Sequence, residues 1–368
     1  MLTKLGSGLE RPPIYMVAPM APTTKLPFYG AFVPIITKSL RAGGFQVIDI
    51  AVVPAYSLSP LAKISRHATL AWRLLRVALA RPQLLYIQSP AWFSVIILSL
   101  MPRNAFYVVN IHGSEIHGRS SAANLFWPFA RALIRRADLV ISPSTAFINQ
   151  VVNATGTDRD KFISSPSGGV EPEKFFFSGS TPAIPTIGYV SRITQRKGWR
   201  LFLSIFDQLK DNNPNIQAII VGDGPERNIL ESELSRRDDN NIVYYGAVPQ
   251  ESLQEIYTSM SVFVFTSDIT GVDTLGLVSL EAQACGVPVV ATDAAITREY
   301  INDGENGFLA KPSDVADFSS RIEVCLDWKA EKRKKIAFGT RRYETSEVGK
   351  RLAVIIDGAM QRNVQRRS

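Results

Sequence analysis

Cysteine and histidine are scarce in this sequence. The 368 residues include two cysteines, Cys285 and Cys325, and three histidines. Two cysteines cannot build a disulfide framework, and no C-x-x-C pair is present to suggest a metal clip or a redox site. Charged residues make up 20% of the chain and hydrophobic residues 46%. This composition excludes a disordered or collagen-like protein and supplies enough apolar material for two cores.

Long apolar segments are absent as well. The longest run, AWFSVIILSLM at residues 91–101, has 11 residues, whereas roughly 20 are needed to cross a bilayer. The opening segment MLTKLGSGLERPP has no apolar centre of the kind found in secretory signals. We therefore expect a cytoplasmic protein that is soluble or bound to a membrane surface.

Acidic residues are missing from one long stretch. No Asp or Glu occurs between Asp49 and Glu115, where basic residues are frequent. Basic residues outnumber acidic ones 17 to 6 over residues 1–170, acidic residues lead 23 to 12 over 171–328, and basic residues lead 12 to 4 over 329–368. This asymmetry predicts a basic face that meets an anionic partner, with a solvated basic surface as the alternative.

The order of apolar runs predicts an α/β protein with two similar halves. Short buried strands alternate with helical stretches throughout, which is typical of parallel sheets covered by helices on both faces. The expected strands are residues 14–18, 45–53, 84–87, 106–111 and 139–142, then 186–190, 217–221, 242–245, 262–265 and 287–291. We therefore expect two Rossmann-like domains, with the boundary at the Pro-, Ser- and Gly-rich segment 178–185. Ligands of such sheets bind beyond the carboxyl ends of the strands, so two facing domains would share one central cleft.

A basic loop follows the first strand of the second half. In VSRITQRKGW, residues 190–199, Arg192 and Lys197 are five positions apart at the start of a helix. Backbone N–H groups and the helix dipole favour an anion at such a position, and the two cations would grip a diphosphate. A basic helix start without a ligand is the alternative.

Two further strand ends carry glycine or acidic residues. The segment VGDGP, residues 221–225, has glycines that permit close backbone approach, although a tight turn needs them too. In DTLGLVSLEAQACGVPVVATD, residues 273–293, Gly276 opens a helix that carries Glu281 about one and a half turns later. A carboxylate there could accept two hydroxyl bonds from a ribose, or it could be an ordinary exposed helical Glu.

These segments together resemble the retaining glycosyltransferases of family 4, also called group 1, which have the GT-B fold. The matching segments are SRITQRKG (191–198), VGDGPER (221–227), DTLGLVSLEAQACGVPVVAT (273–292), ENGFL (305–309) and SPSGGVEPEKF (165–175). The resemblance implies an N-terminal acceptor-binding domain at 1–180, a C-terminal nucleotide-sugar domain at 181–345, and a basic helix at 346–368 that returns to the N-terminal domain.

The resemblance also implies roles for individual residues. Arg192 and Lys197 would bind the donor diphosphate and neutralise the leaving group, and Glu281 would bind the ribose. His112, at the end of the strand FYVVNI, would contact a hydroxyl of the reacting sugar. The remaining donor-binding positions are Gly30, Gly222 and the backbone of Gly276, Leu277 and Val278.

The sequence departs from the family pattern at two positions. The first carboxylate of the family's E-x7-E motif is Asp273 here, one methylene shorter, with Asp268 as a spare candidate. The glycine loop reads Tyr29-Gly30 where a Gly-Gly pair is common. The D-x-D at Asp158–Asp160 falls in a polar loop, so we expect neither a catalytic metal nor another cofactor, and the Arg/Lys pair would supply the electrostatic stabilisation.

The expected reaction is transfer of a sugar from a nucleotide diphosphate to a glycan or lipid-linked acceptor, with retention of configuration. Residues 69–80 predict a basic amphipathic helix with Arg73 and Arg76 on one side and Trp72 on another. This helix and the basic residues 332–335, 341–342 and 366–367 would together face an anionic membrane, peripherally and on its inner side. The alternative for residues 69–80 is a helix packed on the sheet.

Four other functions compete with a transferase. An epimerase of the same fold would release epimerised sugar, and a phosphorylase would need a lysine for pyridoxal, which we do not find. A donor-binding subunit without catalysis would fit a loss of function at Asp273. Nucleic-acid binding lacks the interleaved aromatic and basic residues of known modules.

Overall fold

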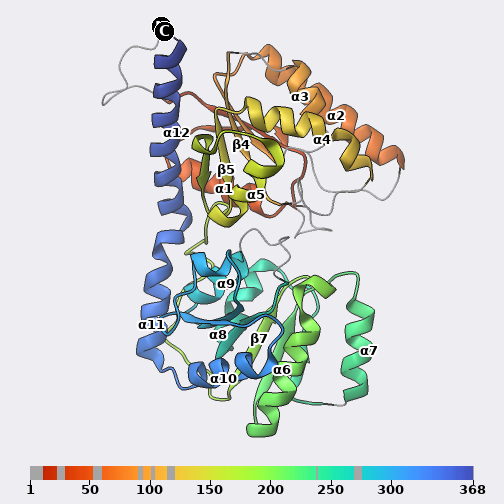
Figure 1. Ribbon diagram of the computed structural model, residues 1–368, viewed down its shortest axis with the longest axis vertical. Helices are drawn as coiled ribbons and strands as arrows, with labels where there is room; N and C mark the ends of the chain where they lie inside the picture. Colours follow the sequence, from red (N-terminus) through yellow and green to blue (C-terminus); the bar gives the residue numbers. More distant parts are fainter. Residues whose placement is uncertain are drawn as a thin grey trace. The chain divides into compact units, whose positions relative to one another are not determined.

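The computed structural model describes residues 11–22, 30–52, 60–89, 94–100, 104–113, 121–237, 239–268 and 276–367. The chain divides into two compact units, Met1–Gly169 with Thr345–Ser368 and Val170–Glu344. Each unit is built around its own six-stranded parallel sheet (Figure 1).

The first unit alternates strands with helices and is completed by the last helix of the chain. Its elements are β1 (Ile14–Ala18), α1 (Phe32–Ala42), β2 (Val47–Val52), α2 (Pro60–Leu79), β3 (Leu84–Gln88), α3 (Ser94–Leu100), β4 (Phe106–Asn110), α4 (Ser121–Arg136), β5 (Leu139–Ser142), α5 (Thr145–Thr155), a short 3-10 turn η1 (Arg159–Lys161), β6 (Phe162–Ser164) and α12 (Thr345–Arg367).

The sheet of this unit has helices on both faces. The strand order is β2-β1-β3-β4-β5-β6. Successive side chains of a strand point to opposite faces, so Leu85 and Ile87 pack against α2, α3, α4 and α5, while Leu84 and Tyr86 pack against α1 and α12. Helix α12 therefore covers the face opposite to α2, α3 and α4 (Figure 1).

Helices α1 and α12 approach each other backbone to backbone. A Cβ on Gly43 would lie 2.4 Å from the carbonyl oxygen of Gly349, and a Cβ on Gly349 would lie 1.9 Å from that of Ser39. Val348, Leu352 and other apolar residues of α12 are buried in the same cluster as the α1 side chains. The two glycines allow this contact, which seals one face of the first sheet.

The second unit repeats the same alternation. Its elements are β7 (Thr186–Val190), η2 (Gln195–Lys197), α6 (Trp199–Asn212), β8 (Gln217–Val221), α7 (Arg227–Arg237), β9 (Ile242–Tyr244), η3 (Gln250–Ser252), α8 (Leu253–Thr258), β10 (Val262–Phe265), α9 (Leu277–Ala284), β11 (Val289–Thr292), η4 (Thr297–Glu299), β12 (Gly307–Ala310), α10 (Val315–Leu326), α11 (Ala330–Gly339) and η5 (Thr340–Tyr343).

Its strand order, β12-β11-β10-β7-β8-β9, places β7 at the centre between β10 and β8. Helices α6, α7 and α10 bury apolar side chains on one face, and α8 and α9 do so on the other. Two Rossmann-like units with parallel sheets confirm the predicted fold class. Both cysteines are free and buried.

The boundary between the two units lies earlier in the sequence than predicted. The second unit begins at Val170, whereas the sequence placed the boundary at residues 178–185. Val170 pairs with Glu344 in an isolated bridge, and Phe175 is buried in a core cluster of the second unit. The segment before the Pro-rich stretch therefore already packs on the second unit.

The basic residues near the C-terminus do not form one surface. Arg333 is buried and donates to the carbonyls of Met260 (2.9 Å) and Ser261 (3.1 Å). Lys332 donates to the carbonyl of Gly304 (2.7 Å). The expectation that residues 332–335 face a membrane together is therefore wrong for these two side chains, because they tie α11 to the second unit.

Within the described residues, no helix combines the length and the apolar character needed to cross a membrane.

Candidate functional site

The cationic loop lies at the carboxyl end of the central strand β7. Arg192 is exposed and Lys197 is partly buried. Lys197 ends the 3-10 turn η2, and its carbonyl accepts from Thr266 Oγ1 (3.1 Å) and Tyr189 Oη (3.2 Å). The turn is thus fixed by hydroxyls of β7 and of the loop after β10.

Two glycines let neighbouring strand-end loops close onto this turn. Gly198 has φ +72°, and a Cβ there would lie 2.2 Å from the carbonyl oxygen of Thr266. Gly222, after β8, has φ +139°, and its Cβ would lie 1.8 Å from the carbonyl oxygen of Ser191. A side chain at either position would push the loops apart. The loops after β7, β8 and β10 are therefore brought together, as the strand-end argument predicts.

Glu226 braces the cationic loop, a role that the sequence analysis missed. Its Oε2 accepts from Trp199 Nε1 (2.8 Å) and from Arg200 Nη1 (2.8 Å). The hydrogen bond from Trp199, together with those from Arg200 and the backbone of Gln195, lowers the pKa of Glu226. The carboxylate thus contacts residues on both sides of Lys197. The segment GDGPER contained this acid, but nothing in its spacing indicated the partner.

The N-terminus of α9 adds backbone donors to the same edge of the sheet. Gly276 is the N-cap, and Leu277 and Val278 begin the helix. Their backbone N–H groups have no acceptor among the described residues, as expected for a first helical turn. A Cβ on Gly276 would lie 2.5 Å from Tyr300 Oη, so Tyr300 is a neighbour of this helix end that the sequence did not reveal.

Glu281 is a buried acid on α9, not an exposed helical one. It is 8% exposed, and its Oε2 accepts from Tyr257 Oη (3.1 Å). Burial raises the pKa of Glu281 from 4.5 to about 7, and hydrogen bonds from Tyr257 and Gln250 only partly oppose this rise. A carboxyl group that titrates near neutrality is typical of functional sites.

In the first unit, His112 directly follows β4. Its Nε2 lies 2.8 Å from Gln88 Oε1, so the neutral ring donates to this amide oxygen. The ring stacks on Phe32, with 3.8 Å between ring centroids. Burial lowers the pKa of His112 to about 3, so the imidazole is neutral over the physiological pH range.

Gly30 lies just before α1, with φ +75°, and a Cβ there would lie 3.0 Å from Met20 Cγ. The turn therefore needs a glycine, although the neighbouring Tyr29 lies outside the described residues. Asp273 also lies outside them, so its predicted role stays a prediction.

The D-x-D motif has a structural explanation. Asp158 caps the short turn η1, and its Oδ1 accepts from the backbone N–H of Asp160 (3.1 Å). In the part of the chain that the structure describes, no three His, Cys, Asp or Glu side chains group as metal ligands would.

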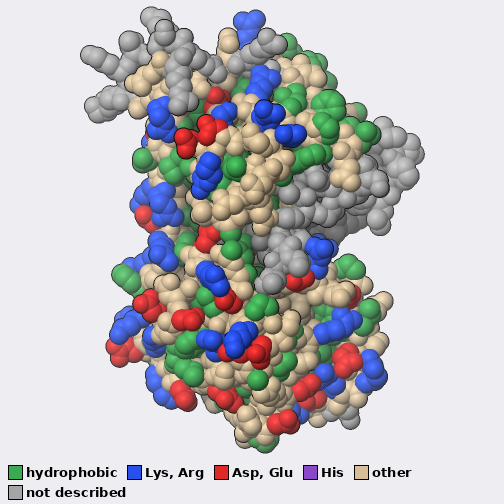
Figure 2. Space-filling model, in the orientation of Figure 1, with side chains coloured by type: hydrophobic (Ala, Val, Ile, Leu, Met, Phe, Trp, Pro, Cys, Tyr) green, Lys and Arg blue, Asp and Glu red, His purple; other side chains and the backbone are tan. Residues whose placement is uncertain are grey.

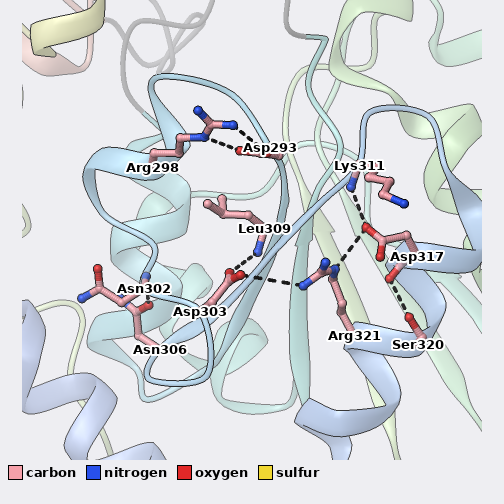
Figure 3. Close-up of polar contacts among 10 residues, drawn as sticks. All are labelled: Asp293, Arg298, Asn302, Asp303, Asn306, Leu309, Lys311, Asp317, Ser320 and Arg321. Carbon is pink, nitrogen blue, oxygen red and sulfur yellow. Dashed lines mark hydrogen bonds and ion pairs between the residues drawn. The ribbon is translucent and has the colours of Figure 1, made fainter.

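Ion pairs order the loops around β11 and β12 (Figure 3). Asp293 accepts from Arg298 Nε (2.6 Å) and Nη2 (2.8 Å), and this pairing lowers its pKa. Asp303 accepts from the backbone N–H of Leu309 (2.7 Å) and lies 3.8 Å from Arg321. These acids are committed to the scaffold that holds the segment ENGFL, so they are poor candidates for ligand contacts.

Curated proteins with similar sequences act in sugar transfer. The chain is 31% identical to the sulfoquinovosyl transferase SQD2 of Arabidopsis thaliana over 54% of this chain, which is 40% of the plant protein. It is 27% identical to a GDP-mannose-dependent alpha-mannosyltransferase of Mycobacterium tuberculosis over 75% of this chain and 71% of that protein. A GDP-mannose-dependent alpha-(1-6)-phosphatidylinositol monomannoside mannosyltransferase of Mycolicibacterium smegmatis is 27% identical over 68% and 70%.

Solved structures share the fold at low identity. HepE of Anabaena, in complex with UDP and glucose, aligns with a TM-score of 0.69 and 18% identity over 94% of this chain and all of that one. Sucrose-phosphate synthase of Thermosynechococcus elongatus aligns with a TM-score of 0.69 and 19% identity over 97% of this chain and all of that one. These likenesses place the chain in the GT-B fold.

Family models account for both units. The model of a glycosyl transferase 4-like domain matches residues 29–166, and that of the glycosyl transferases group 1 matches residues 170–342. The meeting point of the two models coincides with the observed start of the second unit at Val170. The chain belongs to the group 1 glycosyl transferases.

Proposed function

We propose that this protein transfers a hexose from a nucleoside diphosphate donor to a membrane-associated glycan or lipid-linked acceptor, with retention of anomeric configuration. The observation that carries the proposal is the grouping of Arg192, Lys197 and the N-terminus of α9 at one edge of the second sheet. Two cations and the backbone N–H groups of a first helical turn, at the same edge of the sheet, suit a diphosphate.

The residues of the second unit would stabilise the leaving group. As the glycosidic bond to the donor breaks, negative charge grows on the diphosphate, and the positive charges of Arg192 and Lys197 would lower the barrier by stabilising it. Glu281 would accept hydroxyl bonds from the ribose. Asp273 would contact the donor sugar, as the resemblance implies.

His112 would act as a neutral hydrogen-bond partner. Because its Nε2 donates to Gln88 and its pKa is about 3, the ring is unsuited to acid catalysis at neutral pH and suited to orienting a sugar hydroxyl. The acceptor hydroxyl would attack on the side from which the diphosphate leaves, and the diphosphate itself would take the proton. The protein then contributes orientation and charge stabilisation.

The membrane-associated acceptor is supported by charge and by the relatives. The first 170 residues carry 17 basic and 6 acidic residues, and the name of a relative at 27% identity includes a lipid, phosphatidylinositol monomannoside. Peripheral attachment to the inner face of an anionic membrane belongs to the same proposal.

A donor screen followed by product analysis tests the proposal. A nucleotide that binds the folded state raises its melting temperature by mass action, so UDP-, GDP-, ADP- and dTDP-sugars should separate in a thermal-shift experiment. With the preferred donor, NMR of the transferred sugar should show the donor's anomeric configuration. Release of epimerised free sugar would indicate an epimerase, and binding without turnover would indicate a non-catalytic subunit.

We also propose that the reaction needs no metal, since Arg192 and Lys197 supply the positive charge. The rate of transfer should be the same with EDTA as with added Mg²⁺ or Mn²⁺. A rate that falls with EDTA and returns with one of these ions would contradict this part of the proposal.

A further inference from the structure

Among the described residues, two acidic side chains are buried, and both belong to the second unit. They are Glu171 and Glu281, each 8% exposed. On the face shown in Figure 2, by contrast, acidic and basic side chains are mixed over the surface of this unit. Water and salt screen such surface charges, whereas buried charges act on each other more strongly. The groups that surround the two buried acids therefore decide their charge.

The segment SPSGGVEPEKF, residues 165–175, carries one of these acids and its partner. Lys174 Nζ lies 2.8 Å from Glu171 Oε2. The backbone N–H groups of Lys174 (3.0 Å) and Phe175 (2.9 Å) donate to the carbonyl of Glu171, so a tight turn holds the ion pair. The Phe175 ring is buried beside that of Tyr257, with 5.9 Å between centroids. This packing anchors the turn, and with it the ion pair, on α8.

Lys174 also reaches the 3-10 turn that precedes α8. Its Nζ donates to Gln250 Oε1 (3.0 Å). This bond occupies the carbonyl end of the amide, so the NH₂ end of Gln250 remains to donate elsewhere. Gln250 donates to Glu281, and this hydrogen bond lowers the pKa of the acid. One amide thus links the Lys174 ammonium group to the Glu281 carboxyl group.

Tyr257 holds the same carboxyl group from α8. Its Oη donates to Glu281 Oε2 (3.1 Å), and its ring packs edge-on against Phe175 and Phe263. A carboxylate has about four acceptor sites, so two donors from the protein leave room for two hydroxyl groups. Side chains locked by packing and by hydrogen bonds of this kind hold a ligand contact precisely.

The ion pair acts on the charge of Glu281 in two directions. The positive charge of Lys174 lowers the pKa of Glu281, and the negative charge of Glu171 raises it. Burial is the largest cause and brings the pKa to about 7. The carboxyl group is therefore balanced between its two charge states at neutral pH, where a small change in either partner has a large effect.

The other titratable groups near Glu281 keep one charge state around neutral pH. Burial raises the pKa of the Tyr257 hydroxyl and of the Cys285 thiol above their usual values, so both stay protonated. Burial lowers the pKa of Arg333, on α11, to about 10, so it stays charged, and it donates to backbone carbonyls. The charge of Glu281 therefore depends on Lys174 and Glu171.

We propose that Lys174 and Gln250 are positioning residues for Glu281, which keep its carboxylate ionised and oriented to accept two hydroxyl groups of the donor's ribose. The inference rests on the proposed function for the identity of this ligand. Only the ionised form offers both oxygens as acceptors, because the protonated form uses one oxygen to carry its proton. The segment 165–175 thereby gains a role in nucleotide binding through Glu281.

Opposite substitutions in the ion pair test the inference. Lys174→Met and Glu171→Gln both remove the pair, so a merely structural role predicts the same effect from each. We expect the Glu281 titration midpoint to rise by about one pH unit in Lys174→Met and to fall by about as much in Glu171→Gln. NMR of protein labelled with ¹³C at the glutamate carboxyl carbons measures this midpoint without ligand, and Glu281→Gln identifies the signal. Gln250→Met should raise the midpoint, because a donor is lost.

Calorimetric titration with UDP-glucose and GDP-mannose extends the test to the nucleotide. At pH 7, Lys174→Met should bind the preferred one about fivefold more weakly than the wild type, because less Glu281 is ionised. At pH 6, Glu171→Gln should bind it about fivefold more tightly, a gain that damage to the fold does not produce. The 2′,3′-dideoxy form should bind all three proteins alike, since it lacks the hydroxyl groups that Glu281 would accept.

Two control variants separate this effect from the loss of an ion pair. Lys210 pairs with Asp239 (2.6 Å) in the same unit, and its side chain is 36% exposed, against 31% for Lys174. Lys210→Met should therefore leave the Glu281 midpoint and the nucleotide affinity unchanged. Lys174→Arg keeps the positive charge and should restore the wild-type midpoint.

Two results would overturn the inference: an unchanged midpoint in Lys174→Met, or shifts of the same sign in both ion-pair variants. The proposed function fails in a different way. If the midpoints shift in opposite directions but the protein binds neither nucleotide sugar, Lys174 controls the charge of Glu281 and the proposed function is wrong. If the ordinary and dideoxy forms bind equally well to the wild type, the ribose is not the ligand of Glu281.

Discussion

The two units have the same architecture but different surfaces. Both place a six-stranded parallel sheet between helices. In the second unit the specialised features lie at the strand ends, where glycines at 198 and 222 let three loops touch. In the first unit they extend over the outer layer of helices, where apolar and basic side chains face outward. The comparison shows that the second unit gathers glycines and cations at its strand ends, whereas the first unit exposes apolar side chains on its helices.

Removing a cation from the second unit should have the largest effect on this contrast. We expect Lys197→Ala to lower kcat/KM by about a thousandfold. A loss of this size is typical when a side chain that stabilises charge in the transition state is removed. Vesicle binding should be unaffected, because the variant leaves the first unit unchanged. The measurement is steady-state kinetics with the preferred donor, with Arg236→Ala on the exposed side of α7 as the control. Equal activity of Lys197→Ala and Arg236→Ala would show that the positive charge of Lys197 does not contribute to catalysis.

Glu281 sharpens the contrast through pH. Its pKa is about 7 in the folded protein and 4.5 ordinarily, so its contribution to the free energy of unfolding is fully present below pH 4.5 and is lost as pH rises through 7. The full loss is roughly 3 kcal/mol, at 1.36 kcal/mol for each pKa unit. Glu281→Gln should therefore melt at a higher temperature than the wild type at pH 8.5 and at a similar one at pH 4.5.

The same variant should bind the nucleotide more weakly, because an amide offers the ribose fewer acceptors than a carboxylate. Wild-type affinity should fall as pH drops from 8 to 6, while that of Glu281→Gln should stay level in calorimetric titrations. If Glu281→Gln is less stable than the wild type at pH 8.5, the ionised Glu281 carboxylate does not destabilise the folded protein, and the prediction is wrong.

Gly222 provides the smallest of the three effects and the closest control. We expect Gly222→Ala to lower the free energy of unfolding by roughly 1–3 kcal/mol, because its φ of +139° is strained for alanine and the new Cβ would meet Ser191. Gly246→Ala has a matching left-handed backbone, φ +65°, and nothing within 4 Å of the new Cβ. Chemical denaturation should show a smaller loss there, and only Gly222→Ala should also weaken donor binding.

The sequence predicted the sheets well where strands are apolar throughout. It missed β6 and β12, one edge strand of each sheet. β6 has three residues and exposes Ser164, and β12 begins with a glycine, Gly307. At the site it predicted which loops gather, since parallel strands fix where their ends lie. It could not predict the contact of Glu226 with Trp199, because side-chain pairing across loops depends on three-dimensional packing.

Exposure was the property that the sequence could not assign. The spacing of Leu70, Leu74 and Val77 predicts the buried side of α2, but whether Trp72 and Leu79 are covered depends on what packs over them. The burial of Glu281 is similar, because Tyr257 comes from another helix. Charge counts likewise predicted that the basic tail and the basic helices of the first unit share one surface. The structure places α12 on the opposite face of the first sheet from α2, α3 and α4.

The crossing of α12 onto the first unit has a consequence for how the chain is made. The face of the first sheet beneath α1 is sealed by residues after Thr345, so a ribosome must synthesise the whole second unit before the first can be finished. Domains normally fold in the order in which they emerge. In this protein the unit that begins first is completed last. Ile14 and Tyr86 belong to the core cluster that α12 completes, so this cluster stays incomplete until α12 has been synthesised.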